Sequence, residues 1–170
     1  MNILAFETAT ETMVVAAARQ EFWACYQTSN GLKHAAQLAP HIRRITSDLD
    51  FSVKDVSLIG VGIGPGSFTG VRIGIATAKG LAAVTGARIV GISGLDILAH
   101  AQRHFNGIVV PVIDARKNRF YSACYREGDR ISDYFDKSHD DLSTTINAFA
   151  PDGEPVLLTG PANNQFFAKT

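Results

Sequence analysis

The 170-residue chain lacks an excess of either charge, a long apolar run and a large number of cysteines. Its 16 basic residues balance 16 acidic ones, so no overall field would draw in nucleic acid or an anionic membrane. No run of about 18 uncharged apolar residues occurs, and the start, MNILAFETATE, lacks the basic region of a signal peptide. We therefore expect no membrane segment, and contact with RNA only through a partner or a small local patch.

The two cysteines, Cys25 and Cys124, each lie inside a run typical of a strand, FWACYQ and FYSACY. Cysteine in such a run is most often a buried free thiol in a reducing compartment. A disulfide or a metal-binding pair is the alternative. We expect two buried free thiols and a cytoplasmic protein.

The first half of the chain predicts the element order βββαβαβα. Its first three strands are rich in Val, Ile, Ala and aromatics, so antiparallel pairing of neighbours is expected. After a turn at 29–31, apolar residues from Leu38 to Leu49 recur at helical spacing. Ser93 is expected to cap the third helix, with Asp96 completing a capping box. Strands are expected over 2–7, 12–19, 21–28, 58–63 and 88–92, and helices over 38–49, 68–85 and 94–105.

The second half begins the same pattern again, which indicates a duplicated βββαβα unit. Strands are expected over 108–114, 119–126, 130–135 and 155–159, and helices over 140–149 and 163–169. Two such units form the two-lobed, actin-like (ribonuclease-H-like) α/β fold, here with lobes over 1–105 and 106–170. The second copy is incomplete, so we expect the natural chain to continue past Thr170. The first strand of each unit ends in a carboxylate, Glu7 or Asp114, before a tight polar link.

The strongest local signal is the run from Gly64 to Ala83, GPGSFTGVRIGIATAKGLAA. Alternate glycines from 60 to 66 leave one face of the preceding strand without side chains, so a ligand or another segment must approach there. The run fits neither nucleotide loop, because Thr69 stands where a glycine is required, and Ser67 lacks the flanking glycines of a hydrolase elbow. A helix begins here, whose first N–H groups either bind an anion or are capped by Ser67 or Thr69.

This run closely resembles the GPGSFTG signature of the TsaB (YeaZ) family, which serves the bacterial machinery that makes threonylcarbamoyladenosine on tRNA. The resemblance covers essentially the whole chain and departs from the family pattern at two places. Glu7 replaces the usual aspartate, and residues 35–37 replace Ser-Glu-Leu. Supporting segments are ILAFETAT at 3–10, the Lys33-His34 region with Leu38 and Pro40, and VPVIDAR at 110–116.

The resemblance implies a non-catalytic scaffold or activator subunit. Such a subunit pairs with a TsaD-like catalytic subunit and a TsaE-like ATPase, forms a homodimer when alone, and meets tRNA only indirectly. It implies no metal and no cofactor of the chain's own, with ATP or ADP at a partner interface as the alternative. Neither strand-end carboxylate is followed by the glycine that close phosphate approach requires, so the nucleotide site is expected to be vestigial, at Glu7, Thr8, Thr10 and Asp114.

The helix over 68–85 is expected to form the dimer and partner interface. Its apolar residues surround the axis, so it needs cover on both sides. Ile73 and Leu81 are expected to pack on its own sheet, while a ladder of small residues admits a second helix backbone. Cover by the first helix of the same lobe is the alternative. The expected interface residues are Phe68, Gly70, Val71, Gly74, Ala78 and Ala82.

Two enzymatic hypotheses compete with the scaffold. A small kinase or acyltransferase of the same superfamily would use Glu7 and Asp114 around a metal-nucleotide. A glycoprotease-like peptidase needs a nucleophile–base pair or a metal triad, and the sequence shows neither. His100 and His104 have the spacing of two metal ligands on one helix, but no carboxylate lies nearby, so a solvated helix end is expected.

Overall fold

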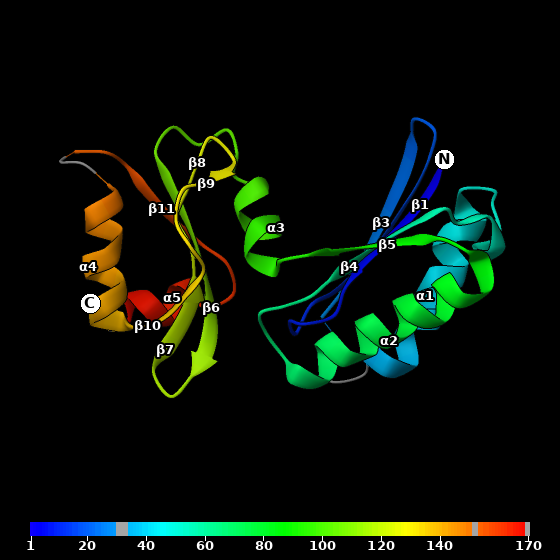
Figure 1. Ribbon diagram of the computed structural model, residues 1–170, viewed down its shortest axis with the longest axis horizontal. Helices are drawn as coiled ribbons and strands as arrows, with labels where there is room; N and C mark the ends of the chain where they lie inside the picture. The colour runs from blue at the N-terminus through cyan, green and yellow to red at the C-terminus, as the bar shows by residue number, and fades with distance from the viewer. Residues whose placement is uncertain (30–33, 151–152, 169–170) are drawn as a thin grey trace. The chain divides into compact units, whose positions relative to one another are not determined.

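A computed structural model of the chain describes residues 1–29, 34–150 and 153–168 (Figure 1). It contains two compact units, Met1–Ile92 and Ser93–Thr170, and each is built on its own β-sheet. This mixed α/β architecture confirms the fold class expected from the sequence. None of the helices in the described part of the chain has the length and apolar character that a bilayer crossing requires.

The first unit follows the predicted element order closely. The bounds of β1, α2 and β5 agree with those predicted, α1 begins four residues before the expected Leu38, and the other predicted bounds differ by a residue. The turn expected at 29–31 lies largely outside the described residues. The elements are β1 (Asn2–Glu7), β2 (Met13–Arg19), β3 (Phe22–Thr28), α1 (His34–Asp48), the 3-10 turn η1 (Val53–Asp55), β4 (Leu58–Gly62), α2 (Phe68–Thr85) and β5 (Arg88–Ile92).

The first sheet has the strand order β3-β2-β1-β4-β5. The first three strands pair antiparallel, and β4 and β5 run parallel to β1. Both helices pack on one face of this sheet, where Leu38 of α1 and Ala78 of α2 join a single core with Leu4 and Ile59 (Figure 1). Side chains alternate along a strand, so residues between the core positions, such as Ala5, face away from the helices.

The second unit contains the helix that was expected to close the first lobe. Ala99 of α3 joins a buried cluster with Val109 and Tyr125, so this helix packs with the second sheet and the division lies between Ile92 and Ser93. The elements are α3 (Gly94–His100), β6 (Ile108–Arg116), β7 (Arg119–Ser122), β8 (Tyr125–Arg126), β9 (Asp129–Arg130), β10 (Phe135–Ser138), α4 (His139–Phe149), β11 (Val156–Thr159) and α5 (Asn163–Phe167).

The strand expected over 119–126 is interrupted in its middle and forms two short strands, β7 and β8. β7 and β8 pair with β6 in a single register, as Val112↔Ser122 and Val109↔Tyr125 show. At the break, the Cys124 N–H donates to Ser132 Oγ (2.8 Å) instead of a ladder carbonyl. The next predicted strand is divided in the same way, into β9 and β10.

Because β7 and β8 act as one strand, and β9 and β10 as the next, the second sheet repeats the order of the first. Both run third strand, second strand, first strand, fourth strand, with β11 parallel to β6 as β4 is to β1. A helix precedes the fourth strand in both units and another follows it. The described part of the second unit has no counterpart of β5. The repeat supports the duplication inferred from the sequence.

The two cysteines differ in exposure. Cys124 is fully buried, as expected, whereas Cys25 is exposed and both are free thiols. The prediction was wrong for Cys25 because β3 is the edge strand, and Cys25 pairs with Ala16 on the sheet face that no helix of the first unit covers.

Candidate functional site

The loop that follows β1 docks on the first turn of α2. The Ser67 N–H donates to the Ala9 carbonyl (2.6 Å), and Thr8 Oγ1 donates to the Gly70 carbonyl (2.8 Å). A β-carbon at Gly66 would overlap the Ala9 carbonyl, and one at Gly70 would overlap that of Thr8. These glycines of the signature run are therefore needed for the packing of the chain on itself.

The Glu7 carboxylate occupies the space that the glycines of β4 leave open. A β-carbon at Gly62 would overlap this carboxylate, and one at Gly60 would stand 3.2 Å from the Ala5 β-carbon. The expected close approach is thus made by side chains of β1. Glu7 Oε1 accepts the Ala9 N–H (2.5 Å), while Oε2 is buried without a hydrogen-bond partner among the described residues. Burial raises the pKa of Glu7, and the hydrogen bond from Ala9 opposes this rise.

The start of α2 is capped by a side chain. Ser67 is the N-cap residue, and its Oγ accepts the Gly70 N–H (3.2 Å). Of the two interpretations of this helix start, the structure shows capping. The other polar residues of the β1 loop are also engaged within the chain, since Thr10 Oγ1 donates to the Thr12 carbonyl (2.8 Å) and His34 Nε2 lies 2.8 Å from the Thr10 carbonyl oxygen.

The structure thus gathers three of the four expected nucleotide-site residues, Glu7, Thr8 and Thr10, in one loop. Asp114 lies in β6 of the second unit, two residues before this strand ends at Arg116, and its contacts are within that unit. Its Oδ1 accepts the Arg116 N–H (2.7 Å), which repeats the contact of Glu7 with the N–H two residues ahead. The two carboxylates therefore accept equivalent hydrogen bonds in the two units.

The small residues of α2 face their own sheet. Gly70, Gly74 and Ala78 are buried, and a β-carbon at Gly74 would lie 2.6 Å from Thr8 Oγ1. This corrects the expectation that the ladder faces a second molecule. A helix lying close to a sheet needs small residues just as a helix pair does, and their spacing alone does not reveal which neighbour they meet.

The solvent side of α2 carries a different set of residues. Phe68 is 69% exposed and Val84 is 77% exposed, and Arg72 and Lys79 are exposed between them. The Arg72 guanidinium carbon lies 3.7 Å from the centroid of the Phe68 ring, a cation–π contact at the start of the helix. Of the other expected interface residues, Val71 and Ala82 are half-buried.

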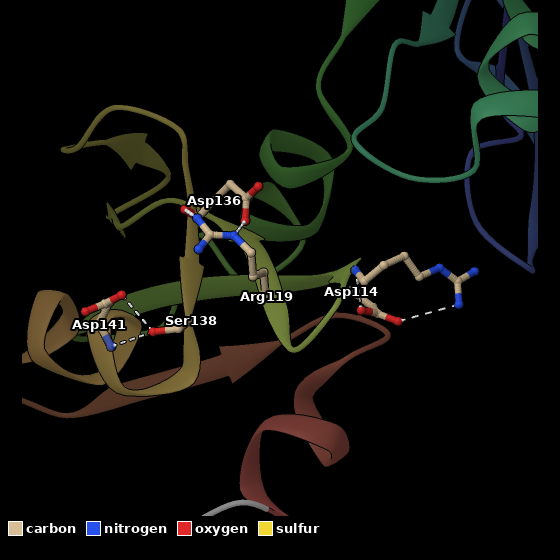
Figure 2. A network of polar contacts seen from close by, with 6 residues as sticks. Asp114, Arg119, Asp136, Ser138 and Asp141 are labelled. Atoms are coloured by element: carbon tan, nitrogen blue, oxygen red, sulfur yellow. Dashed lines mark hydrogen bonds and ion pairs between the residues drawn. The ribbon is translucent and has the colours of Figure 1, made fainter.

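The turn between β6 and β7 forms a second polar group of residues, which the sequence pattern did not single out as a site (Figure 2). Arg116, Lys117 and Asn118 all have positive φ angles, of 67°, 51° and 64°. Arg119 pairs with Asp136 of β10 through Nε and Oδ1 (2.8 Å). The signal that was available is compositional, since three of the four residues at this turn are basic.

Asp96 has a role other than the expected capping box. Its two carboxylate oxygens accept the hydroxyls of Tyr125 and Tyr134, each at 2.6 Å, while Ser93 Oγ caps the helix through the Leu95 N–H (3.2 Å). Burial and the hydrogen bond to Asp96 raise the pKa of Tyr125. α3 is thereby tied to the β8 strand and to the segment before β10.

His100 and His104 do not lie on one helix, because α3 ends at His100 and His104 lies in the turn beyond it. Within the described ranges, no group of three or more His, Cys, Asp or Glu residues is placed to hold a metal ion.

The family model described as "TsaD: tRNA N6-adenosine threonylcarbamoyltransferase" matches residues 29–166. The chain is 38% identical over 127 residues to the tRNA threonylcarbamoyladenosine biosynthesis protein TsaB of Bacillus subtilis, covering 74% of this chain and 56% of that protein. It is 36% identical over 133 residues to TsaB of Escherichia coli, covering 74% and 55%. The chain thus spans about half the length of the curated relatives it matches.

Comparison with solved structures supports the same fold class. "YeaZ from Pseudomonas aeruginosa" is 30% identical with a TM-score of 0.72, over 80% of this chain and 66% of that one. A protein described by its similarity to the peptidase YeaZ from Pseudomonas aeruginosa is 28% identical with a TM-score of 0.81, over 94% and 74%. A Bacteroides thetaiotaomicron protein with an actin-like ATPase fold shares that fold at 11% identity, with a TM-score of 0.50 over 99% and 86%.

Proposed function

This chain belongs to the TsaB (YeaZ) family within the tRNA N6-adenosine threonylcarbamoyltransferase (TsaD) group, and from that premise we propose that it is a non-catalytic scaffold subunit in the biosynthesis of threonylcarbamoyladenosine on tRNA. The curated relatives in Bacillus subtilis and Escherichia coli are named as proteins of this biosynthesis. We place its work in the cytoplasm, in an assembly whose partner proteins supply the main contact with tRNA.

The observation that carries the non-catalytic role is the closed loop after β1. A phosphate at this strand end would need free backbone N–H groups and space above them. Glu7 takes the Ala9 N–H, Ser67 caps the Gly70 N–H, and the Thr8 backbone fills the space at Gly70. The loop therefore favours a protein that does not turn over nucleotide by itself, and any ATP or ADP would be held at a partner interface.

The exposed side of α2 is the surface we propose for pairing with a TsaD-like catalytic subunit and, in the isolated chain, with a second copy. Phe68 and Val84 offer apolar contact, and α2 carries Arg72 and Lys79 but no acidic residue. This combination suits a partner surface with apolar contacts for the two ends of α2 and acidic residues facing the cations between them. A TsaE-like ATPase joins the pair in the proposed assembly.

Co-purification with the TsaD-like protein of the same genome tests the proposal. We expect a stoichiometric complex that forms threonylcarbamoyladenosine on tRNA, whereas this chain alone does not. The kinase or acyltransferase hypothesis predicts instead that the chain alone turns over Mg-ATP, with loss of turnover in Glu7→Gln or Asp114→Asn. Such turnover, or failure of the wild-type chain to bind the TsaD-like protein, contradicts the scaffold role.

A further inference from the structure

The turn between β6 and β7, residues Arg116, Lys117, Asn118 and Arg119, is named here the basic tip. It is exposed along all four residues and holds three cations, in a chain whose total charge is zero. Nothing in the scaffold role proposed above uses it.

The backbone of the basic tip is strained. Arg116, Lys117 and Asn118 have consecutive left-handed φ angles, a conformation that asparagine tolerates and that arginine and lysine disfavour. Strain of this kind persists where the surrounding structure fixes it, and it is typical of functional loops.

Two contacts hold the tip in this conformation (Figure 2). On the β6 side, Asp114 Oδ1 accepts the Arg116 N–H (2.7 Å). On the β7 side, Arg119 donates through Nε to Asp136 Oδ1 (2.8 Å) and through Nη2 to the Asp136 carbonyl (2.5 Å). The Arg119 side chain therefore stabilises the turn through its two hydrogen bonds to Asp136.

Of the other two cations, Arg116 has one long ion pair, with Asp114, and Lys117 has none among the described residues. The Arg116 side chain is 88% exposed, and its Nη1 lies 3.8 Å from Asp114 Oδ2, too far for a hydrogen bond. Lys117 is exposed, and its side chain has no ion pair or hydrogen bond among the described residues. The fold thus presents two adjacent cations on a braced, projecting turn.

We propose that the basic tip contacts the phosphate backbone of tRNA, with Arg116 and Lys117 each neutralising one phosphate. This inference rests on the proposed function, which brings the chain to a tRNA-modifying assembly. Phosphate contacts position a protein on RNA without reading its sequence, and a flexible basic side chain on a projecting turn suits an extended polyanion. A small nucleotide would need enclosing walls, and the four exposed residues of the tip provide none.

Binding of the chain to an unmodified tRNA transcript, measured over a series of salt concentrations, tests the inference. We expect Arg116→Gln/Lys117→Gln to weaken binding at low salt by about tenfold and to reduce the slope of log K against log salt by about 1.5. The charge-keeping variant Arg116→Lys/Lys117→Arg should bind as the wild type does. Lys54→Gln/Arg88→Gln, which removes two exposed cations from the first unit, is the matched control and should have a smaller effect.

Equal losses in the two charge-removing variants, or no loss in either, would show that the basic tip has no special part in RNA binding. A parallel titration with Mg-ATP separates the two sources of phosphate. If the tip variant loses Mg-ATP binding while tRNA binding is unchanged, the tip is a nucleotide contact and the inference is wrong.

Capture by the TsaD-like subunit distinguishes this inference from the proposed function. We expect Arg116→Gln/Lys117→Gln to be captured as well as the wild type, because only RNA contact is removed. Loss of capture in this variant alone would make the tip a protein contact and overturn the inference. Failure of the wild-type chain to be captured would instead overturn the proposed function, whatever the tRNA measurements show.

Discussion

Gly70 and Thr8 interlock at the start of α2. Thr8 Oγ1 donates to the Gly70 carbonyl (2.8 Å), and a β-carbon at position 70 would overlap the carbonyl oxygen of Thr8. The Thr8 side chain is 1% exposed, so it has no room to withdraw. The first turn of α2 is therefore held against the loop after β1, and a residue larger than glycine does not fit at position 70.

Gly70→Ala should destabilise the protein, because the new methyl group meets backbone atoms instead of a flexible side chain. We expect a loss of about 1–3 kcal/mol in the free energy of unfolding, measured in denaturant. Gly80→Ala in the same helix is the matched control, since nothing lies within 4 Å of a β-carbon there. That variant should gain about 0.5–1 kcal/mol from helix propensity. Equal stability of the two variants would contradict the packing described.

Phe68→Ala/Val84→Ala should weaken pairing with the TsaD-like subunit or with a second copy while leaving the fold intact. Both side chains are exposed in the isolated chain, and burying an apolar side chain of this size in an interface contributes about 1–3 kcal/mol. Light scattering and capture assays provide the measurement. Trp23→Ala, at an exposed aromatic of β3, serves as the control and should pair normally.

Ala78→Trp should fail to fold, because Ala78 is 1% exposed in the core beneath α2. Circular dichroism and thermal unfolding decide this. A folded Ala78→Trp protein that has lost only its ability to dimerise would show that the small-residue ladder faces a partner after all.

Glu7 should make the stability of the protein fall as the pH rises. Burial raises its pKa in the folded state, so the folded chain keeps the proton to a higher pH than the unfolded chain does. The stabilisation is complete below the unfolded pKa of about 4.3 and is lost as the pH rises through the folded value. We therefore expect the difference in Tm between Glu7→Gln and the wild type to shift in favour of Glu7→Gln between about pH 4 and pH 7.

The control for this pH series is Glu11→Gln, which removes an exposed carboxylate from the same loop and so matches the change in net charge. A Tm difference between Glu7→Gln and the wild type that is constant with pH would show that the Glu7 carboxylate is not buried as described.

The two thiols should differ in reactivity. Burial raises the pKa of Cys124 to about 11, which leaves its thiol protonated at pH 8, and the side chain is also inaccessible. Cys25 is exposed. An aromatic disulfide reagent should titrate one thiol in the native protein and two after unfolding, and Cys25→Ser should abolish the native reaction. Rapid native reaction of both thiols would contradict the burial of Cys124.

Lys117→Gly should raise stability while weakening contact with tRNA. Relief of the left-handed strain at this residue is worth about 1–2 kcal/mol, of which glycine's greater freedom in the unfolded chain removes about 0.5–1 kcal/mol. Lys117→Ala removes the same charge but keeps a β-carbon, so it should bind tRNA equally weakly without the gain in stability. A Lys117→Gly protein less stable than Lys117→Ala would show that the backbone there is not strained.

The sequence predicted the fold well because alternation and helical spacing survive where one face of an element is buried. Leu38, Ile42 and Ile45 are all buried on α1 as their spacing predicted, and β1, α2 and β5 have the expected bounds. The glycine-rich run also predicted that something would approach β4 closely, although it did not show that Glu7 of the same unit would do so.

The direction of side chains on α2 could not be predicted, because this helix is apolar or small on most of its surface and spacing alone does not distinguish its own sheet from a partner. The strain at Lys117 could not be predicted from the sequence either, because lysine does not favour positive φ and no glycine marks the turn. Asp96 suggested a capping box, but its partners Tyr125 and Tyr134 lie 29 and 38 residues further along the chain. A local sequence motif cannot reveal contacts at that separation.

The repeated strand order allows the two halves of the protein to be compared with each other. Tandem copies of one supersecondary unit keep what the sheet requires and diverge elsewhere. A carboxylate that accepts the N–H two residues ahead is present in both halves, at Glu7 and Asp114. The glycines of α2 and the basic turn of the second half have no such counterpart, since α5, the helix equivalent to α2 in chain order, contains no glycine. Aligning one half on the other, strand on strand, therefore pairs Glu7 with Asp114 and separates the features that both halves share from those present in one half alone.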